Sequence, residues 1–567
     1  MAMKRIYKVF LLAFCLLPCC ATAHDFMADS ICYNITSEKY MTCEVTFCSD
    51  YKPENVYNRF YKNVVFVPEK VNYNGKEYTV TAVGNDAFSR SDLLLSVVLP
   101  NTIVGIGHGA FSSCPNFKSF TLPASVRVFD SWAFSLMPSL EYLAVEPGNE
   151  LYDSREGCNA IIKTDSNVLV TGCRTTIIPD GVKVIANSAF ISCFGHGGSN
   201  IEPVTMIVPK SVEVIEPQAF TGFSSLTSVS FSEGLKKIEN RAFAGTGIKS
   251  LLIPASVEEI CPEAFHGCDS LQEIKVKKGN KVYDSRKGCN AIIESMTDKL
   301  LLGCSVTDIP NGVKIIGEHA FAKSRIEKLE FPSSVEEIET QAFFNCKNLK
   351  EIVIPGNVKK IGHDAFRASA LERVVVLEGV ESIGSSAFGS CRELRSVSLP
   401  ASVRTLGSEY SGIFTESRLL ERVTMGKGNE RYYCSAYVLI DKENGTIIDG
   451  WGTMSRCYIG NSFARSIVKK IGRHAFYGHD LLAIVVIPEN VEEIEYKAFS
   501  GCEGLRVIEC EAKVPPVLGT DVFKLNYSRI DRSLPLQERV VLVVPAGSLE
   551  AYRNAPGWKD FKHMVEN

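Results

Sequence analysis

The sequence predicts a solenoid rich in short parallel β-strands, in which similar coils of about 23 residues stack on one another. Three observations predict it: a fixed repeat, an apolar alternation inside each repeat, and prolines and glycines at its corners. A period of 20 to 50 residues is typical of units that bury their apolar side only against a neighbour. The repeat is marked by the dipeptides Ala87-Phe88, Ala110-Phe111, Ala133-Phe134, Ala189-Phe190, Ala219-Phe220, Ala242-Phe243, Ala264-Phe265, Ala320-Phe321, Ala342-Phe343, Ala365-Phe366, Ala387-Phe388, Ala475-Phe476 and Ala498-Phe499.

Each repeat follows the plan L-x-x-I-x-I-P-x-x-V-x-x-I-G-x-x-A-F-x-x-C, as in residues 349–366. The apolar residues of LKEIVIP (349–355) predict a short parallel strand, which ends at the proline because proline cannot donate to a ladder. A second apolar pair follows in residues 358–361, and the glycine after it suits a corner that needs unusual backbone angles. We expect Phe366 to fill the interior, and the small Ala365 to let neighbouring coils approach.

This unit resembles the BspA-like leucine-rich repeat, a variant of about 23 residues that occurs in exported and surface proteins of Bacteroidetes and other host-associated microbes. The resemblance covers approximately residues 80–512. It implies a right-handed leucine-rich-repeat solenoid with terminal caps. It also implies an adhesin-like role, because the studied members of the family look like proteins that bind host matrix proteins or other bacteria.

The ends of the chain lack the repeat and are predicted to cap the solenoid. Residues 24–79 alternate as strands around an Asn74-Gly75 turn, and we expect this N-terminal β cap to cover the edge of the first coil. Residues 513–567 are expected to form the C-terminal cap, with one last strand, a short helix, and Trp558 and Phe561 sealing the core.

Residues 1–23 have the features of a secretory signal peptide: a basic start, an apolar run and the small-x-small sequence Ala21-Thr22-Ala23. No later stretch reaches about 18 continuous apolar residues, so no transmembrane span is predicted. We therefore expect an exported protein, either secreted or at the cell surface. The alternative is a lipoprotein anchored at Cys19 or Cys20.

Charge and cysteine positions exclude several kinds of partner. The formal net charge is −4, without the concentrated basic face of a nucleic-acid-binding protein. The cysteines fall in register with the repeat instead of forming C-x-x-C or Cys/His motifs, so we predict neither a metal site nor a cofactor. Six of them, three residues after a repeat phenylalanine, are predicted to be buried structural thiols: Cys114, Cys193, Cys268, Cys346, Cys391 and Cys502.

The period is interrupted by three related inserts, near residues 144–178, 275–309 and 423–459. Each contains two apolar runs around a polar turn, which predicts a β-hairpin. We expect these hairpins to project from one edge of the solenoid, roughly 25 to 30 Å apart, because strands stack at about 4.8 Å. In the first two inserts the cysteines are symmetric about the turn, which predicts the disulfides Cys158–Cys173 and Cys289–Cys304.

The first two inserts also share the string Tyr-Asp-Ser-Arg, at residues 152–155 and 283–286. One interpretation is structural, because an Asp-Ser pair caps turns and a preceding tyrosine packs on the solenoid. The other interpretation is that the string recognises a ligand. Both remain open at the level of the sequence.

No catalytic motif occurs in a credible context, and no enzyme activity is predicted. The histidines near the repeat Ala-Phe and the paired glutamates at one corner of successive coils follow the period of the coil. Their spacing is explained by the repeat alone.

The outward positions of the first strand of each repeat are the candidate ligand surface, because they form a ribbon of mixed charge across neighbouring coils. We expect a monomer that binds an extracellular protein or extended polymer there and at the inserts. A glycan-capturing accessory protein is the alternative, supported by Tyr152, Tyr283, Tyr437 and Trp451 on the inserts; a structural envelope protein is a third class. The candidate ribbon comprises Lys249, Glu273, Glu327, Lys328, Lys350, Glu351, Glu372, Arg373, Arg395, Glu421 and Arg422.

Overall fold

The structure is a computed structural model that describes residues 24–48, 58–195, 202–407, 412–435, 437–451, 456–459, 461–525 and 535–567. The predicted leader, with Cys19 and Cys20, lies outside the described residues. The chain forms two compact units, residues 1–225 and 226–567. The division falls inside the region that the sequence assigns to one set of repeats.

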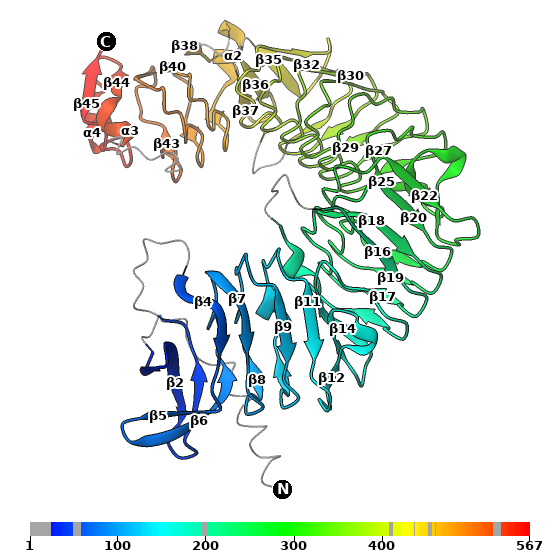
Figure 1. Ribbon diagram of the computed structural model, residues 1–567. Coiled ribbons are helices and arrows are strands. Elements are labelled where there is room, and N and C mark those ends of the chain that lie inside the picture. The colour runs from blue at the N-terminus through cyan, green and yellow to red at the C-terminus, as the bar shows by residue number, and fades with distance from the viewer. Residues whose placement is uncertain are drawn as a thin grey trace. The chain divides into compact units, whose positions relative to one another are not determined.

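In unit 1 most coils contribute two strands, although the coil of β15 has no strand before its proline. The first row holds the strands that precede the repeat proline, and β4, β7, β9 and β11 pair in parallel within it, side by side in the blue to cyan part of Figure 1. The second row holds the short strands that follow this proline, on the adjacent wall of each coil. The first row is β4 (Asn58–Phe66), β7 (Ser91–Val98), β9 (Ser119–Leu122), β11 (Tyr142–Val145) and β16 (Val204–Val208). The second row is β6 (Lys76–Val83), β8 (Gly105–Ile106), β10 (Val128–Phe129), β14 (Val168–Gly172), β15 (Val184–Ile185) and β17 (Val214–Ile215).

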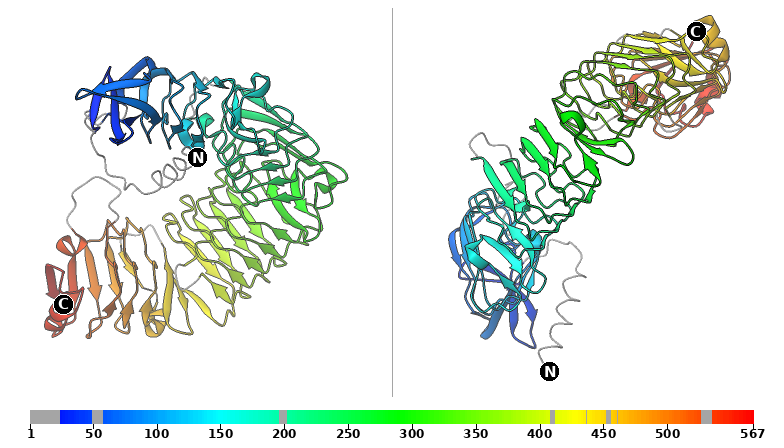
Figure 2. Two further views of the ribbon diagram at one scale, coloured as in Figure 1. Left: turned by 90° about the horizontal axis from the view of Figure 1, so that it is seen from below. Right: turned by 90° about the vertical axis from the view of Figure 1, so that its right-hand side faces the viewer.

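Unit 2 repeats this plan, and its green to yellow coils lie in a regular row in the left-hand view of Figure 2. The first row is β18 (Leu226–Phe231), β20 (Ser250–Ile253), β22 (Glu273–Val276), β28 (Glu351–Ile354), β30 (Arg373–Val376), β32 (Ser396–Leu399), β34 (Arg422–Met425), β38 (Arg456–Tyr458), β40 (Ile484–Ile487), β42 (Val507–Cys510) and β44 (Val541–Val544). The second row is β19 (Lys237–Ile238), β21 (Glu259–Ile260), β25 (Lys299–Gly303), β26 (Ile315–Ile316), β27 (Glu337–Ile338), β29 (Lys360–Ile361), β31 (Ser382–Ile383), β33 (Thr405–Leu406), β37 (Thr446–Gly450), β39 (Lys470–Ile471), β41 (Glu493–Ile494) and β43 (Val517–Leu518).

The Ala-Phe dipeptides form a hydrogen-bonded spine along the coils, as their spacing predicts. The amide of Phe343 donates to the carbonyl of Ala365 at 2.7 Å, and the amide of Phe366 donates to that of Ala387 at 2.8 Å. The rings stack in the interior: the Phe343 ring lies 5.0 Å from that of Phe321 and 4.9 Å from that of Phe366, nearly parallel to both. These separations match the spacing of neighbouring strands, so backbone and side chains repeat with one period.

The prediction that the corner glycine supplies unusual backbone angles is confirmed at Gly407, with φ of 68°, but is wrong at other corners. The corner residues Gly362 and Gly384 do not have positive φ; a side chain on either would instead meet the backbone of the preceding coil. The left-handed conformation occurs two residues later, at non-glycine residues just before the alanine, such as Gln341 and Asp364 with φ of 55° and 53°. At Gly362 and Gly384 the glycine is therefore selected for close approach of the backbones and not for its backbone angles.

Four of the six ladder cysteines are buried as predicted, whereas Cys193 and Cys268 are only partly buried. The Sγ atoms of Cys114, Cys346 and Cys391 donate to the carbonyls of Phe88, Phe321 and Phe366 at 3.1 to 3.2 Å. Ser417 does the same to Phe388, which shows that the position requires a small donor and not sulfur chemistry. Burial raises the pKa of Cys346 to about 12, so this thiol stays protonated.

Each insert is a three-stranded meander whose last strand belongs to the second row, which corrects the expectation of projecting hairpins. The strands β13 and β14 are antiparallel, and β14 then pairs in parallel with β15 of the next coil. The inserts are therefore part of the coil wall. Their strands are β12 (Tyr152–Asp153), β13 (Ala160–Lys163) and β14; β23 (Tyr283–Asp284), β24 (Ala291–Glu294) and β25; and β35 (Tyr432–Ser435), β36 (Val438–Asp441) and β37.

A glycine at the end of each meander takes the place of a repeat phenylalanine. The amide of Gly303 donates to the carbonyl of Ala320 at 2.8 Å, the bond that a phenylalanine amide makes elsewhere. A Cβ atom on Gly303 would overlap the ring of Phe321, and Gly172 and Gly450 are crowded in the same way by Phe190 and Phe476. The meander thus acts as an alternative coil without its own interior ring.

In the third meander, the residue before this glycine is the buried Asp449. Its side chain is 1% exposed, and its Oδ2 atom accepts the amides of Ile413 at 2.5 Å and Phe414 at 3.3 Å. Burial raises the pKa of Asp449 to about 7, although the two donors act in the opposite direction.

Both ends are capped. In the N-terminal cap, β1 (Phe26–Ala28), β2 (Ile31–Ser37), β3 (Thr42–Val45) and β5 (Lys70–Tyr73) join β6, and the predicted Asn74-Gly75 turn has positive φ at both residues. In the C-terminal cap, Trp558 and Phe561 are buried as predicted. This cap has one strand more than predicted, because β45 (His563–Glu566) pairs with β44. α-Helix in the described residues is confined to α2 (Ser462–Ile467), α3 (Leu536–Arg539) and α4 (Leu549–Asn554), and four 3-10 turns are η1 (Ser131–Phe134), η2 (Arg155–Gly157), η3 (Ile191–Cys193) and η4 (Arg286–Gly288).

The stacked rings predict the effect of truncating one of them. Replacing Phe343 with alanine should lower the free energy of unfolding by about 3 to 5 kcal/mol, because the cavity is shared with both neighbouring coils. Val353→Ala, at an exposed position of the next coil, is the matched control and should change it little. Chemical denaturation of the three proteins measures the difference, and equal midpoints would contradict the assignment of Phe343 to the core.

Asp449 predicts a pH-dependent contribution to stability. Between the unfolded pKa near 4 and the folded pKa near 7, the folded state holds a proton that the unfolded state has lost, so stability falls as the pH rises through this range. Asp449→Asn keeps an acceptor oxygen and does not titrate. The free energy of unfolding of this variant, relative to the unmodified protein, should increase by up to about 4 kcal/mol from pH 4 to pH 8. A difference that is constant with pH in denaturant titrations would refute a titrating Asp449.

Candidate functional site

The charged ribbon of unit 2 lies on the first row of strands, as the repeat predicts. In the sheet β28-β30-β32-β34, Glu351, Arg373, Ser396 and Arg422 are aligned in register across four neighbouring strands. Glu351, Arg373 and Arg422 are exposed. All the other ribbon residues are exposed too, except the partly exposed Glu372. The ribbon therefore presents charged side chains at strand spacing.

The ribbon is not continuous, which corrects the expectation of a single surface. Glu273 belongs to β22 of the two-stranded sheet β20-β22, and Lys249 directly precedes β20; the sheet β28-β30-β32-β34 is separate from this sheet. Between the two sheets, residues 305–310 and 326–331 occupy first-row positions without forming strands, although both segments are described. Glu327 and Lys328 lie in the second of these segments. The interruption follows directly after the second insert.

Few of the ribbon charges are neutralised by neighbours. Lys350 pairs with Glu372 at 3.2 Å, Arg395 pairs with Glu421 at 3.1 Å, and Glu273 pairs with Lys275. Exposed pairs of this kind contribute about 0 to 1 kcal/mol, so a ligand displaces them at little cost. Among the described residues, six ribbon members make no ion pair: Lys249, Glu327, Lys328, Glu351, Arg373 and Arg422.

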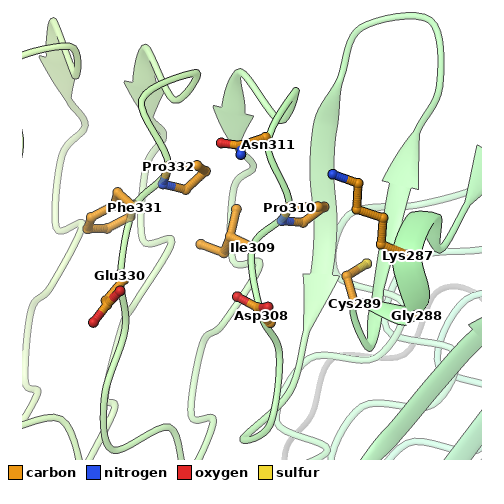
Figure 3. Close-up of a pocket in the computed structure, with 10 residues that line it drawn as sticks. All are labelled: Lys287, Gly288, Cys289, Asp308, Ile309, Pro310, Asn311, Glu330, Phe331 and Pro332. Atoms are coloured by element: carbon orange, nitrogen blue, oxygen red, sulfur yellow. The ribbon is translucent and has the colours of Figure 1, made fainter.

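A groove lies where the first row is interrupted. It has a volume of 320 Å³ and is lined by the second insert on one side and, on the other, by two coils that lack a first-row strand. Figure 3 shows Pro310 and Asn311 between Lys287 of the insert and Pro332 of the following coil. The lining combines a cation, the carboxylates of Asp308 and Glu330, and apolar surface from Ile309 and Phe331. This mixture suits a peptide segment with both charged and apolar side chains.

The Tyr-Asp-Ser-Arg strings make structural contacts, which supports the structural interpretation. The guanidinium of Arg286 forms two hydrogen bonds to the carboxylate of Asp284, at 2.7 and 2.9 Å, and one to that of Asp298 at 2.8 Å. The hydroxyl of Tyr283 accepts the amide of Ile260, the last residue of β21, at 2.9 Å. The string thus joins the meander to the coil before it.

An asparagine that the sequence analysis did not single out fixes each insert. The Nδ2 of Asn280 donates to the carbonyls of Pro254 and Val257, both at 2.9 Å. Its Oδ1 accepts the amides of Val282 and Tyr283. Asn149 and Asn429 make the same four kinds of bond in the other inserts. The shared Gly-Asn dipeptide that opens each insert was the available signal.

The four insert cysteines are unbonded thiols in the structure, in contrast to the predicted disulfides. A β-bulge explains the difference. Near the turn, Ile162 pairs with Leu169, and this register, if continued, would place Cys158 opposite Cys173. Between Ile161 and Ile162, however, the register shifts by one residue. As a result, Ala160 pairs with Gly172. The same shift separates Cys289 from Cys304. Sequence symmetry about a turn does not reveal such a bulge.

Most of the insert aromatic residues proposed for glycan binding are buried. Tyr152, Tyr283 and Trp451 are 9%, 5% and 4% exposed, respectively, and Tyr437 packs against the core as a partly buried residue. Flat rings must face solvent to stack on a sugar, so Tyr152, Tyr283 and Trp451 do not provide such a platform. Tyr142 is exposed, but it belongs to β11 and not to an insert.

One side-chain cluster has the composition of a catalytic site but not its chemistry. The Nε2 of His319 lies 3.0 Å from the Oε1 of Glu263, and the rings of His266 and His319 are 5.3 Å apart. Burial raises the pKa of the nearby Cys268 to about 11, and burial together with Lys323 lowers that of His266 to about 4. The thiol is therefore protonated at neutral pH, and the adjoining cavity of 10 Å³ has room for about one water.

The bulged register predicts the redox state of the inserts. When the protein is unfolded without reductant and alkylated, Cys158, Cys173, Cys289 and Cys304 should all carry the label in peptide mass spectra. Burial raises the pKa of each thiol, which keeps it protonated and slow to oxidise. An unlabelled, linked peptide pair containing Cys158 and Cys173 would show that the bulge is absent in solution.

In the described part of the chain, no helix has the length and apolar character required to cross a membrane.

A search of curated proteins found no match. Solved structures that the chain resembles include a leucine rich cell surface protein from Faecalibacterium prausnitzii, 20% identical, with 86% of this chain and 94% of that chain covered and a TM-score of 0.36. A leucine-rich repeat protein from Bacteroides ovatus is also 20% identical, with 96% and 100% covered and a TM-score of 0.30.

The pattern of the BspA type leucine rich repeat region matches residues 69–195, 193–298, 294–421 and 452–532, which is most of the chain. The match includes all the Ala-Phe repeats and spans the three inserts or their flanks. In the structure, this repeat produces the stacked coils, the stacked phenylalanine rings and the thiols that bond to the phenylalanine carbonyls. The chain therefore belongs to the BspA-type leucine-rich repeat family.

Proposed function

We propose that this protein is an exported, non-enzymatic, adhesin-like binding protein that holds an extracellular protein or extended polymer against the first row of strands in unit 2. The observation that carries the proposal is the register of Glu351, Arg373, Ser396 and Arg422, which presents exposed charge at regular strand spacing. Export rests on the leader in residues 1–23. A surface role is in keeping with the family.

The groove extends this surface. The segment 326–331 contributes Glu327 and Lys328 to the ribbon and Glu330 and Phe331 to the groove, so the two features share one stretch of backbone. An extended ligand that follows the ribbon therefore reaches the groove at the second insert. There, Phe331 and Ile309 offer apolar contact beside the charged groups. Repeated weak contacts along such a ligand raise the overall affinity without any single strong site.

A protein ligand is favoured over a glycan because of what the surface exposes. The ribbon is charged and almost free of aromatic residues, and three of the four insert aromatic residues proposed for sugar stacking are buried. Charged surfaces of mixed sign select partners by electrostatic complementarity and bind in a salt-dependent way. We therefore expect binding to weaken as the ionic strength increases.

Binding is tested with residues 24–567 on two panels, one of immobilised extracellular matrix proteins and one of glycans. The proposal predicts a salt-sensitive partner on the protein panel. In the variant Glu351→Arg with Arg373→Glu, the net charge is unchanged but the pattern is reversed. Its dissociation constant for that partner should increase by about tenfold, which is about 1.4 kcal/mol. Surface plasmon resonance measures the change.

The matched control is Glu381→Arg with Arg404→Glu, which makes the same exchange on the other wall of the coil that contains Arg373 and of the coil after it. It should bind as the unmodified protein does. Equal weakening in both variants would show that the ribbon is not the specific surface. Partners found only on the glycan panel would favour the glycan-capturing alternative.

A further inference from the structure

The N-terminal cap brings together three side chains that bind metals in other proteins. His24 lies two residues before β1, Cys32 lies in β2, and Cys48 follows β3. The antiparallel pairing of Met27 with Cys32 and the bond from the amide of Thr46 to the carbonyl of Cys32 place these segments side by side. One ring nitrogen of His24 and the two Sγ atoms all lie within 4.8 Å of one another.

The surroundings of this cluster are those of a closed site. The side chains of Cys32 and Cys48 are buried, at 0% and 1% exposed. The Nδ1 of His24 is also buried and has no hydrogen-bond partner among the described residues. A buried polar atom without a partner costs about 1 to 3 kcal/mol, so it calls for an explanation such as a bound ion.

The backbone around the cluster is held by separate contacts. The hydroxyl of Tyr61 accepts the amide of Cys32 at 3.3 Å and lies 3.2 Å from the carbonyl of Thr46, to which it donates. On the other side, the carboxylate of Asp25 accepts the amide of Ile35 at 2.7 Å. Such contacts fix the positions of candidate ligands before a metal binds.

We propose that His24, Cys32 and Cys48 bind Zn²⁺, and that the α-amino group of His24, released by removal of the leader, is the fourth ligand. Two thiolates and an imidazole are a ligand set typical of zinc, whereas Ca²⁺ and Mg²⁺ require oxygen ligands. In a tetrahedral zinc site the ligand atoms are about 3.5 to 3.8 Å apart, so the three side chains need to move by only about 1 Å. Binding releases the two thiol protons to solvent.

The fourth ligand rests on the proposed export. Cleavage after Ala21-Thr22-Ala23 makes His24 the first residue, and its α-amino group and Nδ1 then close a six-membered chelate ring on one metal. The two nitrogens and two sulfurs complete a tetrahedral set. The site is therefore complete only in the processed protein. Its role is to tie the segment before β1 to β2 and to the segment after β3, and to protect the two thiols from oxidation.

The spacing of these residues explains why the sequence analysis predicted no metal. Seven residues separate His24 from Cys32, and fifteen separate Cys32 from Cys48, a pattern without a C-x-x-C pair. The three ligands come from three separate segments, which the antiparallel sheet brings together. The ligand set forms only once the register of that sheet is known.

The test uses residues 24–567, produced with His24 as the first residue, reduced, freed of metal and titrated with Zn²⁺ against a chromophoric chelator. The expected result is one zinc per chain. Cys32→Ser and Cys48→Ser should each lower the affinity for Zn²⁺ by more than about 100-fold. Loss of a hydrogen bond to a ligand typically costs only about 10- to 100-fold in metal affinity, and loss of a ligand itself should cost more. Cys43→Ser removes another buried thiol of β3 and is the matched control; it should bind zinc normally.

Substitution with Co²⁺ provides a second measurement, because thiolate ligands give an ultraviolet charge-transfer band and tetrahedral geometry gives strong visible bands. Both should be present, and both should be lost in Cys48→Ser even if this variant is fully folded. A chain with Gly-Ser added before His24 should keep the thiolate band and bind zinc about tenfold or more weakly. Equal affinity with and without the extension would overturn the role of the α-amino group.

A disulfide between Cys32 and Cys48 is the competing outcome. The protein isolated without reductant should contain zinc by elemental analysis and should be alkylated at both cysteines after unfolding. A linked Cys32–Cys48 peptide and no zinc would overturn the proposal. N-terminal sequencing of the exported protein tests leader removal separately, so failure of export and failure of zinc binding are distinguished.

Discussion

The whole structure depends on a single distance, the separation of neighbouring strands in a β-ladder. Each coil must advance by this distance, so every side chain that points inward meets its equivalent from the next coil at about 5 Å. Phenylalanine rings stack at this separation, as the rings of Phe343 and Phe366 do at 4.9 Å. Small residues are required wherever backbones approach, which explains Ala365 beside the ring and Gly362 at the corner.

The inserts interrupt the stack of phenylalanine rings that this strand spacing produces. A meander that starts a new ladder cannot also place a ring in the stack, so Gly303 occupies the ring's position and Phe321 fills the space. The ladder bonds lost at the break are replaced by the amide of Asn280 and the hydroxyl of Tyr283. The first row loses two strands at the same place, and this loss opens the groove beside Lys287. The interruption of the first row thus creates a groove that combines a cation, two carboxylates and apolar side chains.

Features that depend on the repeat could be predicted from the sequence, and features that depend on register could not. The Ala-Phe spine, the ladder thiol of Cys346 and the Asn74-Gly75 turn follow from local pattern and were correct. The bulge between Ile161 and Ile162 was not visible, and it moved Cys158 away from Cys173. The positive φ of Asp364 was missed because Gly362, two residues earlier, attracts that interpretation. The ribbon residues are exposed, or partly exposed at Glu372, but Glu327 and Lys328 lie in no strand, and this break in the first row depends on how the second insert packs.

The side-chain anchors at the inserts have a consequence for the length of the molecule. The contacts of Asn280 reach only the coil before the insert, at Pro254 and Val257, and those of Gly303 reach only the coil after it. Because coils interact only with their neighbours, a coil can be duplicated or lost between two inserts without changing any residue of either insert. Gain or loss of a coil during evolution would therefore change the distance between two inserts in steps of one strand spacing.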